Sequence, residues 1–159
     1  MNILGESVVK TNVRKNKRTQ PRERKYNFLK YLRVVRYYIK KKYGLSSAEL
    51  DMLLYLYDVP VFKKEDFNVF QTSMSWNKKR FYQMIKEGYI KEWRGGGIKN
   101  ARSKMYELTQ KSKTICLSIY KKLLKEEKIT EDPRINPVFK NNSYTDKMYR
   151  KIIQKMNAK

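Results

Sequence analysis

Residues 71–94 read QTSMSWNKKRFYQMIKEGYIKEWR, and this stretch decides the fold that we expect. The segment 71–75 is polar and lacks glycine, which is typical of a tight turn between two helices. Ser75 is placed to cap the next helix, in which apolar residues recur at helical spacing from Trp76 to Glu87, and Gly88 then ends it. A short apolar segment, 62–70, precedes the turn and predicts another helix. The stretch therefore predicts two short helices joined as in a helix-turn-helix.

Downstream of this unit, the sequence predicts a β-hairpin. Residues 89–94 alternate between apolar and polar side chains, as a half-buried strand does. Three glycines at 95–97 interrupt the pattern, and alternation returns over 103–108. The segment between them is expected to form a long flexible tip.

Helices are predicted on both sides of this centre. In residues 26–43, Phe28, Leu32, Val35 and Ile39 recur at helical spacing, and Gly44 follows as a stop. Ser46 and Glu49 form a capping box for a second helix, which runs to Tyr57. No Lys or Arg occurs from Leu45 to Phe62, so we expect this helix to lie inside the protein.

The C-terminal third continues with helices. Thr109 is placed to cap a helix that ends near Lys125, residues 131–142 predict a loop, and residues 144–156 predict a last helix. The predicted fold class is mainly α with a small β-hairpin (α+β). We expect three parts: a disordered basic arm (1–25), a DNA-binding domain with dimerisation helices (26–126), and a C-terminal loop and helix (127–159).

The composition of the chain limits the classes of function that we expect. The 159 residues carry 38 Lys and Arg against 15 Asp and Glu, a net charge of +23. A chain this basic is expected to bind a polyanion, most simply nucleic acid, although the charge is also compatible with a solvated coat that has no specific partner. The absence of His removes the commonest general base and metal ligand, so we expect no enzyme activity, no metal and no cofactor. One Cys and no apolar run of membrane-spanning length favour a cytoplasmic, nucleoid-associated protein that is neither secreted nor membrane-bound.

Two segments carry a family resemblance. Residues 100–109, NARSKMYELT, resemble the wing of the MarR family, where Asp-x-Arg is followed by a strand and Leu-Thr. Residues 86–90, KEGYI, resemble the end of that family's recognition helix. Asn100 and Ala101 stand where the family usually has Asp and Arg. The resemblance implies a winged helix-turn-helix transcription regulator that binds duplex DNA as a homodimer, with a palindromic or near-palindromic site and extra terminal helices for dimerisation.

The dimer expectation also has a basis in the sequence. Apolar stripes in the first helix (Phe28, Leu32, Val35, Ile39) and in the helix after the hairpin (Ile115, Ile119, Leu123) are more than one subunit obviously covers. We therefore expect a second copy to bury them.

The helix 76–87 is predicted to lie in the major groove. Its apolar residues share one face, so that Lys79, Gln83 and Lys86 point away from the core and toward base edges. Serines near its N-terminus suit a phosphate, and arginines on the hairpin suit the minor groove. The candidate DNA-binding residues are Ser73, Ser75, Trp76, Lys79, Arg80, Gln83, Lys86, Arg94, Lys99, Arg102 and Lys104.

Several alternatives stay open. An architectural protein that coats DNA or RNA with little sequence preference would show the same charge. The three glycines suggest a phosphate loop, but the Gly-Lys-Ser/Thr that should follow is missing. Cys116 is expected to be packed rather than oxidant-sensing. The many tyrosines are expected in the core or an interface rather than in a pocket for an unknown small-molecule effector.

Overall fold

The computed structural model describes residues 27–74, 77–93 and 104–158 of the chain. Its elements, in chain order, are η1 (Phe28–Tyr31), α1 (Leu32–Tyr43), α2 (Ser47–Leu56), β1 (Phe62–Lys63), α3 (Lys64–Met74), α4 (Lys78–Lys86), β2 (Ile90–Glu92), β3 (Met105–Leu108), α5 (Gln110–Leu123), α6 (Pro137–Lys140) and α7 (Tyr144–Asn157). The expected arm, 1–25, and the expected hairpin tip lie outside the described residues.

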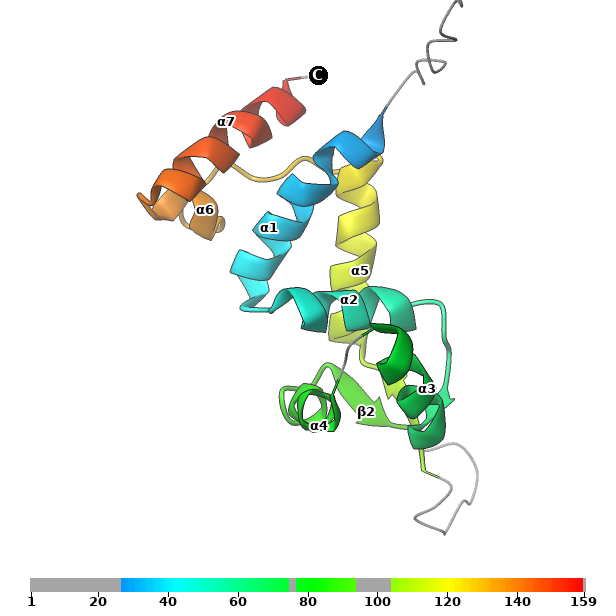
Figure 1. Ribbon diagram of the computed structural model, residues 1–159. Coiled ribbons are helices and arrows are strands. Elements are labelled where there is room, and N and C mark those ends of the chain that lie inside the picture. The colour runs from blue at the N-terminus through cyan, green and yellow to red at the C-terminus, as the bar shows by residue number, and fades with distance from the viewer. Residues whose placement is uncertain (1–26, 75–76, 94–103, 159) are drawn as a thin grey trace, which may run out of the picture.

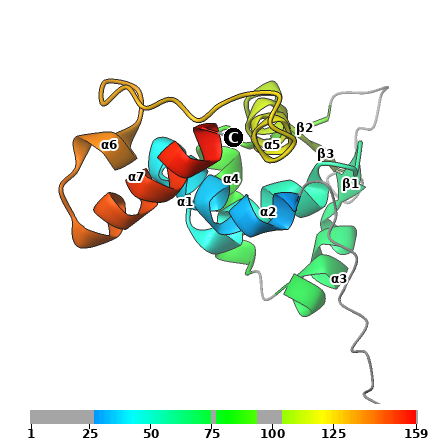
Figure 2. The same ribbon diagram turned by 90° about the horizontal axis from the view of Figure 1, so that it is seen from above.

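The described elements gather at two ends of the molecule, which α1, α2 and α5 connect (Figure 1). The three-stranded antiparallel sheet, in the order β1-β3-β2, lies at one end together with α3 and α4. Helices α6 and α7 lie at the other end, against α1. Figure 2 shows, from above, α6 and α7 on one side of α1 and α2, with α3 and β1 on the other side. Helix α5 packs against α1 and α2 and connects the two ends. The expected class, mainly helical with a small antiparallel sheet, is confirmed.

The predicted signals at α1 and α2 are present. Gly44 caps α1 in the left-handed conformation, with φ +67°, which a glycine adopts without a steric penalty. Ser46 and Glu49 form the reciprocal capping box, because each side chain accepts a hydrogen bond from the other's backbone N–H, at 3.2 and 2.7 Å. Leu50 and Leu53 of α2 are fully buried, as the lack of basic residues in this segment predicted.

Two predicted boundaries around the central turn are wrong. Phe62 and Lys63 form strand β1 instead of opening a helix, because they pair with Tyr106 and Met105 of β3. The expected turn 71–75 is helical as far as Met74, where no glycine or proline interrupts α3.

The next helix also differs from its prediction. It starts at Lys78, two residues later than expected, and Asn77 is its N-cap in place of Ser75. The expected loop 131–142 contains the short helix α6, whose first residue is Pro137 and whose cap is Asn136.

Most of the expected dimerisation stripes are covered within one chain, but Phe28 and Leu32 are only half-buried. Val35 and Ile39 of α1 and Ile115 and Ile119 of α5 are at most 2% exposed, and Leu123 is 9% exposed. They are buried because α1 packs directly on α5 and because the C-terminal segment folds back over α1. Val138, Ile153 and Met156 join the same core. The five stripe residues therefore need no second subunit to bury them, and the homodimer stays a prediction.

Candidate nucleic-acid interface

One face of α4 holds the helix on the protein. Phe81 and Met84 are buried, and the Phe81 ring lies 4.5 Å from that of Phe67 in α3 and 5.2 Å from that of Tyr106 in β3, measured between centroids. The ring of Phe62 in β1 is 6.3 Å away. These contacts bury a large apolar area and join α4 to α3 and to two strands at once. The predicted inward face of this helix is confirmed.

The opposite face of α4 is open to solvent. Lys79, Gln83 and Lys86 are exposed, as predicted, and Tyr82 beside them is 49% exposed. Together with Glu87, these four residues line a shallow hollow of about 480 Å³. The exposed face therefore offers cations, an amide and an aromatic ring on a rigidly packed helix.

Local hydrogen bonds fix both ends of α4. At the N-terminus, the Asn77 side chain accepts a hydrogen bond from the backbone N–H of Arg80, at 2.8 Å. At the C-terminus, Gly88 turns the chain with φ +77°. Thr109 Oγ1 donates to the Gly88 carbonyl at 2.8 Å, and Ser112 Oγ donates to the Tyr89 carbonyl at 2.6 Å. The start of α5 therefore sets the direction in which α4 ends.

The cations of α4 stand apart from the acidic residues. In the described part of the chain, no carboxylate lies within salt-bridge distance of Lys78, Lys79, Arg80 or Lys86. The helix itself contains no Asp or Glu. Its positive charge is thus available to an external anion.

The lysines of the sheet are placed differently. Lys91 pairs with Glu107 at 3.1 Å, and Lys104 pairs with Glu92 at 3.2 Å. Lys104 was predicted to bind DNA, and its side chain is still 47% exposed. An exposed pair of this kind contributes little stability, so Lys104 can exchange its carboxylate for a phosphate at small cost.

Apart from Lys104, the predicted residues divide into three groups. Lys79, Arg80, Gln83 and Lys86 share α4. Ser73 was expected at the N-terminus of this helix, but it lies in the last turn of α3, because α3 is longer than predicted. The remaining predicted residues lie outside the described part of the chain: Ser75, Trp76, Arg94, Lys99 and Arg102.

Sequence reasoning missed Lys64 and Lys78. The Lys64 ammonium donates a hydrogen bond to the Tyr82 hydroxyl and lies 5.1 Å from the centre of its ring, which links α3 to the exposed face of α4. This hydrogen bond raises the pKa of Lys64 above its ordinary value, so the charge is held at neutral pH. No sequence signal identifies Lys64, because its partner is 18 residues away. Lys78 is the first residue of α4, so its place on this helix could be predicted only once Asn77 was known to be the cap.

Gln83 has a partner that the sequence did not reveal. Its amide Nε2 donates to a Glu87 carboxylate oxygen at 2.8 Å, one helical turn away. The Gln83 carbonyl oxygen keeps its acceptor positions. Glu87 also places one negative charge at the C-terminal edge of the basic face.

Cys116 and several of the tyrosines are packed, as expected, although Tyr55 is 42% exposed. Cys116 is fully buried with Sγ 3.5 Å from the Leu53 carbonyl oxygen, and burial raises the pKa of its thiol to about 12. Tyr31 and Tyr38 are buried, and Tyr37 stacks on Tyr149 of α7 with centroids 3.9 Å apart. A protonated, enclosed thiol is unsuited to oxidant sensing.

Other kinds of site find no support among the described residues. No group of three or more His, Cys, Asp or Glu side chains is placed there to hold a metal ion. No helix among them has the length and apolar character needed to cross a membrane. Comparison of the chain with protein-family models, curated proteins and solved structures finds no match.

Proposed function

We propose that this protein is a sequence-specific duplex DNA-binding transcription regulator of MarR-like winged helix-turn-helix type. In this proposal α4 enters the major groove and the chain between β2 and β3 forms the wing, which contacts the minor groove. The protein acts by binding and occlusion or recruitment, without covalent chemistry. It binds its site as a homodimer in the cytoplasm, in association with the nucleoid.

The observation that carries the proposal is the contrast between the buried face and the exposed face of α4. The helix is anchored by buried aromatic side chains on one face and presents unpaired cations, Tyr82 and Gln83 on the other. A major groove admits one helix, and only a rigidly held helix can present side chains to base edges in a fixed register. The order of elements from α1 to α5 is also the order expected of a winged helix.

Electrostatics supports the same surface. Lysines of α4 without carboxylate partners attract phosphates before any base is read. Lys64 extends this charge onto α3, and Lys111 of α5 lies over the Tyr89 ring at the end of α4. When α4 lies in the major groove, Lys64 and Lys111 can contact DNA phosphates on its two sides.

The experiment begins with selection of bound duplexes from a random pool, which gives a consensus site. Gln83→Ala is then compared with Lys79→Ala on that site and on random duplex. A bidentate contact from Gln83 to adenine predicts a loss of about 1–3 kcal/mol on the selected site only. Lys79→Ala should weaken binding to both duplexes about equally, if Lys79 contacts phosphate, and should reduce the salt slope by about one unit.

Glu87→Gln is the matched control for Gln83→Ala. Gln83→Ala removes the hydrogen bond between the two side chains, whereas Glu87→Gln keeps an amide oxygen that can accept it and removes only the negative charge that opposes phosphate. It should strengthen binding to both duplexes. If selection yields no consensus, or if Gln83→Ala weakens both duplexes in proportion, α4 reads no bases, and the architectural coating function replaces the proposal.

A further inference from the structure

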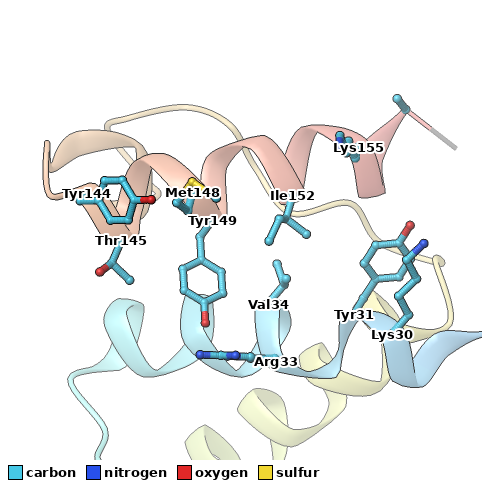
Figure 3. Close-up of a pocket in the computed structure, with 11 residues that line it drawn as sticks. Lys30, Tyr31, Arg33, Val34, Tyr144, Thr145, Met148, Tyr149, Ile152 and Lys155 are labelled. Atoms are coloured by element: carbon cyan, nitrogen blue, oxygen red, sulfur yellow. The ribbon is translucent and has the colours of Figure 1, made fainter.

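A groove runs between α7 and the helices η1 and α1, at the end of the molecule opposite α4 (Figure 3). Its volume is about 770 Å³. Tyr149 and Ile152 point into it from α7, and Val34 and Tyr31 point into it from α1 and η1. These side chains give the groove an apolar floor.

The shape of the groove fits a helix. Its lining residues on α7 extend from Tyr144 to Lys155. Eleven residues of helical rise span about 16 Å, which corresponds to about three turns of a helix lying alongside. Tyr144 is 79% exposed and Met148 is 43% exposed at the edge of the groove. Exposed aromatic and Met side chains beside an apolar channel are typical of surfaces that bind the apolar face of an amphipathic helix.

The charge at the rim limits what can bind. Lys30, Arg33 and Lys155 border the groove, and none of the described residues that line it is acidic. Asp146 of α7 is fully buried and bonded to Tyr37, Lys41 and Ser143, so it does not offset these cations. The occupant must therefore combine an apolar face with negative charge.

A second copy of the chain does not meet this requirement. None of the described helices carries more than two carboxylates, and α1, α4 and α5 carry none. Two copies would also bring two highly basic chains together at this rim. Nucleic acid satisfies the cations but has no apolar face for the floor.

We propose that the groove between α7 and η1–α1 binds an acidic amphipathic helix of a partner protein. The apolar side of that helix would lie on Val34, Tyr149 and Ile152, with Tyr144 and Met148 closing over it. Its carboxylates would face Lys30, Arg33 and Lys155. This site lies apart from α4 and does not depend on the DNA-binding proposal.

The probe is an acetylated, amidated peptide of about 16 residues with Leu on one helical face and Glu on the other. A peptide of the same composition with the amphipathic order scrambled controls for attraction to the net charge. Binding to the full-length protein is measured by fluorescence anisotropy, and amide chemical shifts locate the site. The amphipathic peptide should bind about tenfold tighter or more than the scrambled one and should shift residues of α1 and α7.

Surface variants test the groove without disturbing the core. Tyr144→Glu and Met148→Glu should each weaken peptide binding about tenfold, since each removes apolar surface and adds a charge of the same sign as the peptide. Val69→Glu is the matched control, because Val69 is 65% exposed on α3 at the far end of the molecule. The double variant Arg33→Glu/Lys155→Glu should prefer a Leu/Lys peptide over the Leu/Glu peptide. DNA affinity should be unchanged in Tyr144→Glu and Met148→Glu, because α7 lies at the end of the molecule opposite α4.

Three results would overturn the proposal. Equal binding of the scrambled peptide would show attraction to the net charge alone. Binding of dodecanoate, with the Leu/Glu peptide excluded, would assign the groove to a small amphiphilic acid. A wild-type dimer that Tyr144→Glu converts to monomer would assign it to a second copy.

Discussion

Asp146 joins the last helix to the first through three side chains at once. Its carboxylate accepts hydrogen bonds from Tyr37 at 2.8 Å, from Lys41 at 3.0 Å and from Ser143 at 2.6 Å. Burial alone would raise the pKa of Asp146, but these three donors, with the Lys41 charge, hold it below its ordinary value. Burial and the bond to Asp146 raise the pKa of Tyr37, so its hydroxyl remains a donor at neutral pH.

The low pKa of Asp146 makes the stability of this junction depend on pH in a known direction. A group whose pKa is lower in the folded than in the unfolded chain stabilises the fold above the unfolded value, about 3.9 for Asp. We predict that Asp146→Asn lowers the free energy of unfolding by about 1–3 kcal/mol at pH 7, because the Lys41 ammonium loses its charged partner. The difference from wild type should shrink as the pH falls below about 4. Thermal unfolding across this range measures it.

Glu126→Gln is the control for this prediction. Glu126 is an exposed carboxylate just beyond α5, and its replacement should change the free energy of unfolding by less than about 0.5 kcal/mol. An Asp146→Asn difference that stays constant from pH 7 to pH 3 would contradict the assigned role of the carboxylate.

Local signals in the sequence were enough to predict most helices. The Ser46 capping box, Gly44 and Gly88 mark helix ends through bonds between near neighbours, and all three are present. Strand β1 could not be predicted this way, because Phe62 and Lys63 become a strand only through pairing with residues more than 40 positions away. The start of the helix predicted over 76–87 was placed two residues too early. Ser75 and Asn77 are both good caps, and sequence alone does not rank them.

In the candidate site, too, local features could be predicted from the sequence and contacts between distant residues could not. The inward and outward faces of α4 could be predicted, because helical periodicity alone decides them. Three other features could not be predicted: the hydrogen bond from Lys64 to Tyr82, the pairing of Lys104 with Glu92, and the hydrogen bonds from Thr109 and Ser112 to the carbonyls of Gly88 and Tyr89. Each depends on how separate elements pack.

Helix α5 carries the apolar surface that a dimer would still need. With most of the predicted stripes buried, Leu117, Tyr120 and Leu124 remain 43%, 44% and 55% exposed, and their spacing places them on one face. We predict that the full-length protein sediments as a dimer at moderate salt and that Leu124→Glu makes it a monomer, because the interface would then bury an unpaired charge. Val69→Glu, on α3, should remain dimeric. A wild-type monomer at micromolar concentration would exclude this interface.

At the scale of the whole molecule, charge is distributed unevenly along the chain. The core of the described residues extends from Tyr31 to Met156. That segment carries eight Lys and Arg against two Glu. If the protein binds duplex DNA through its backbone, affinity should fall about 10³–10⁵-fold between 50 and 200 mM salt for six to ten phosphate contacts.

Removal of residues 1–25 separates their contribution from that of α4. We predict that the truncated protein keeps the thermal unfolding temperature of the full chain, because the described core lies between Tyr31 and Met156, but binds duplex DNA more weakly. The plot of log affinity against log salt should become shallower by about 0.9 for every phosphate that the truncated protein no longer neutralises. A full-length variant with the eight basic residues of this segment changed to Gln should behave like the truncation, since charge and not chain length is responsible. Loss of folding on truncation, or an unchanged salt slope in the Gln variant, would show that the segment serves the core and not the DNA.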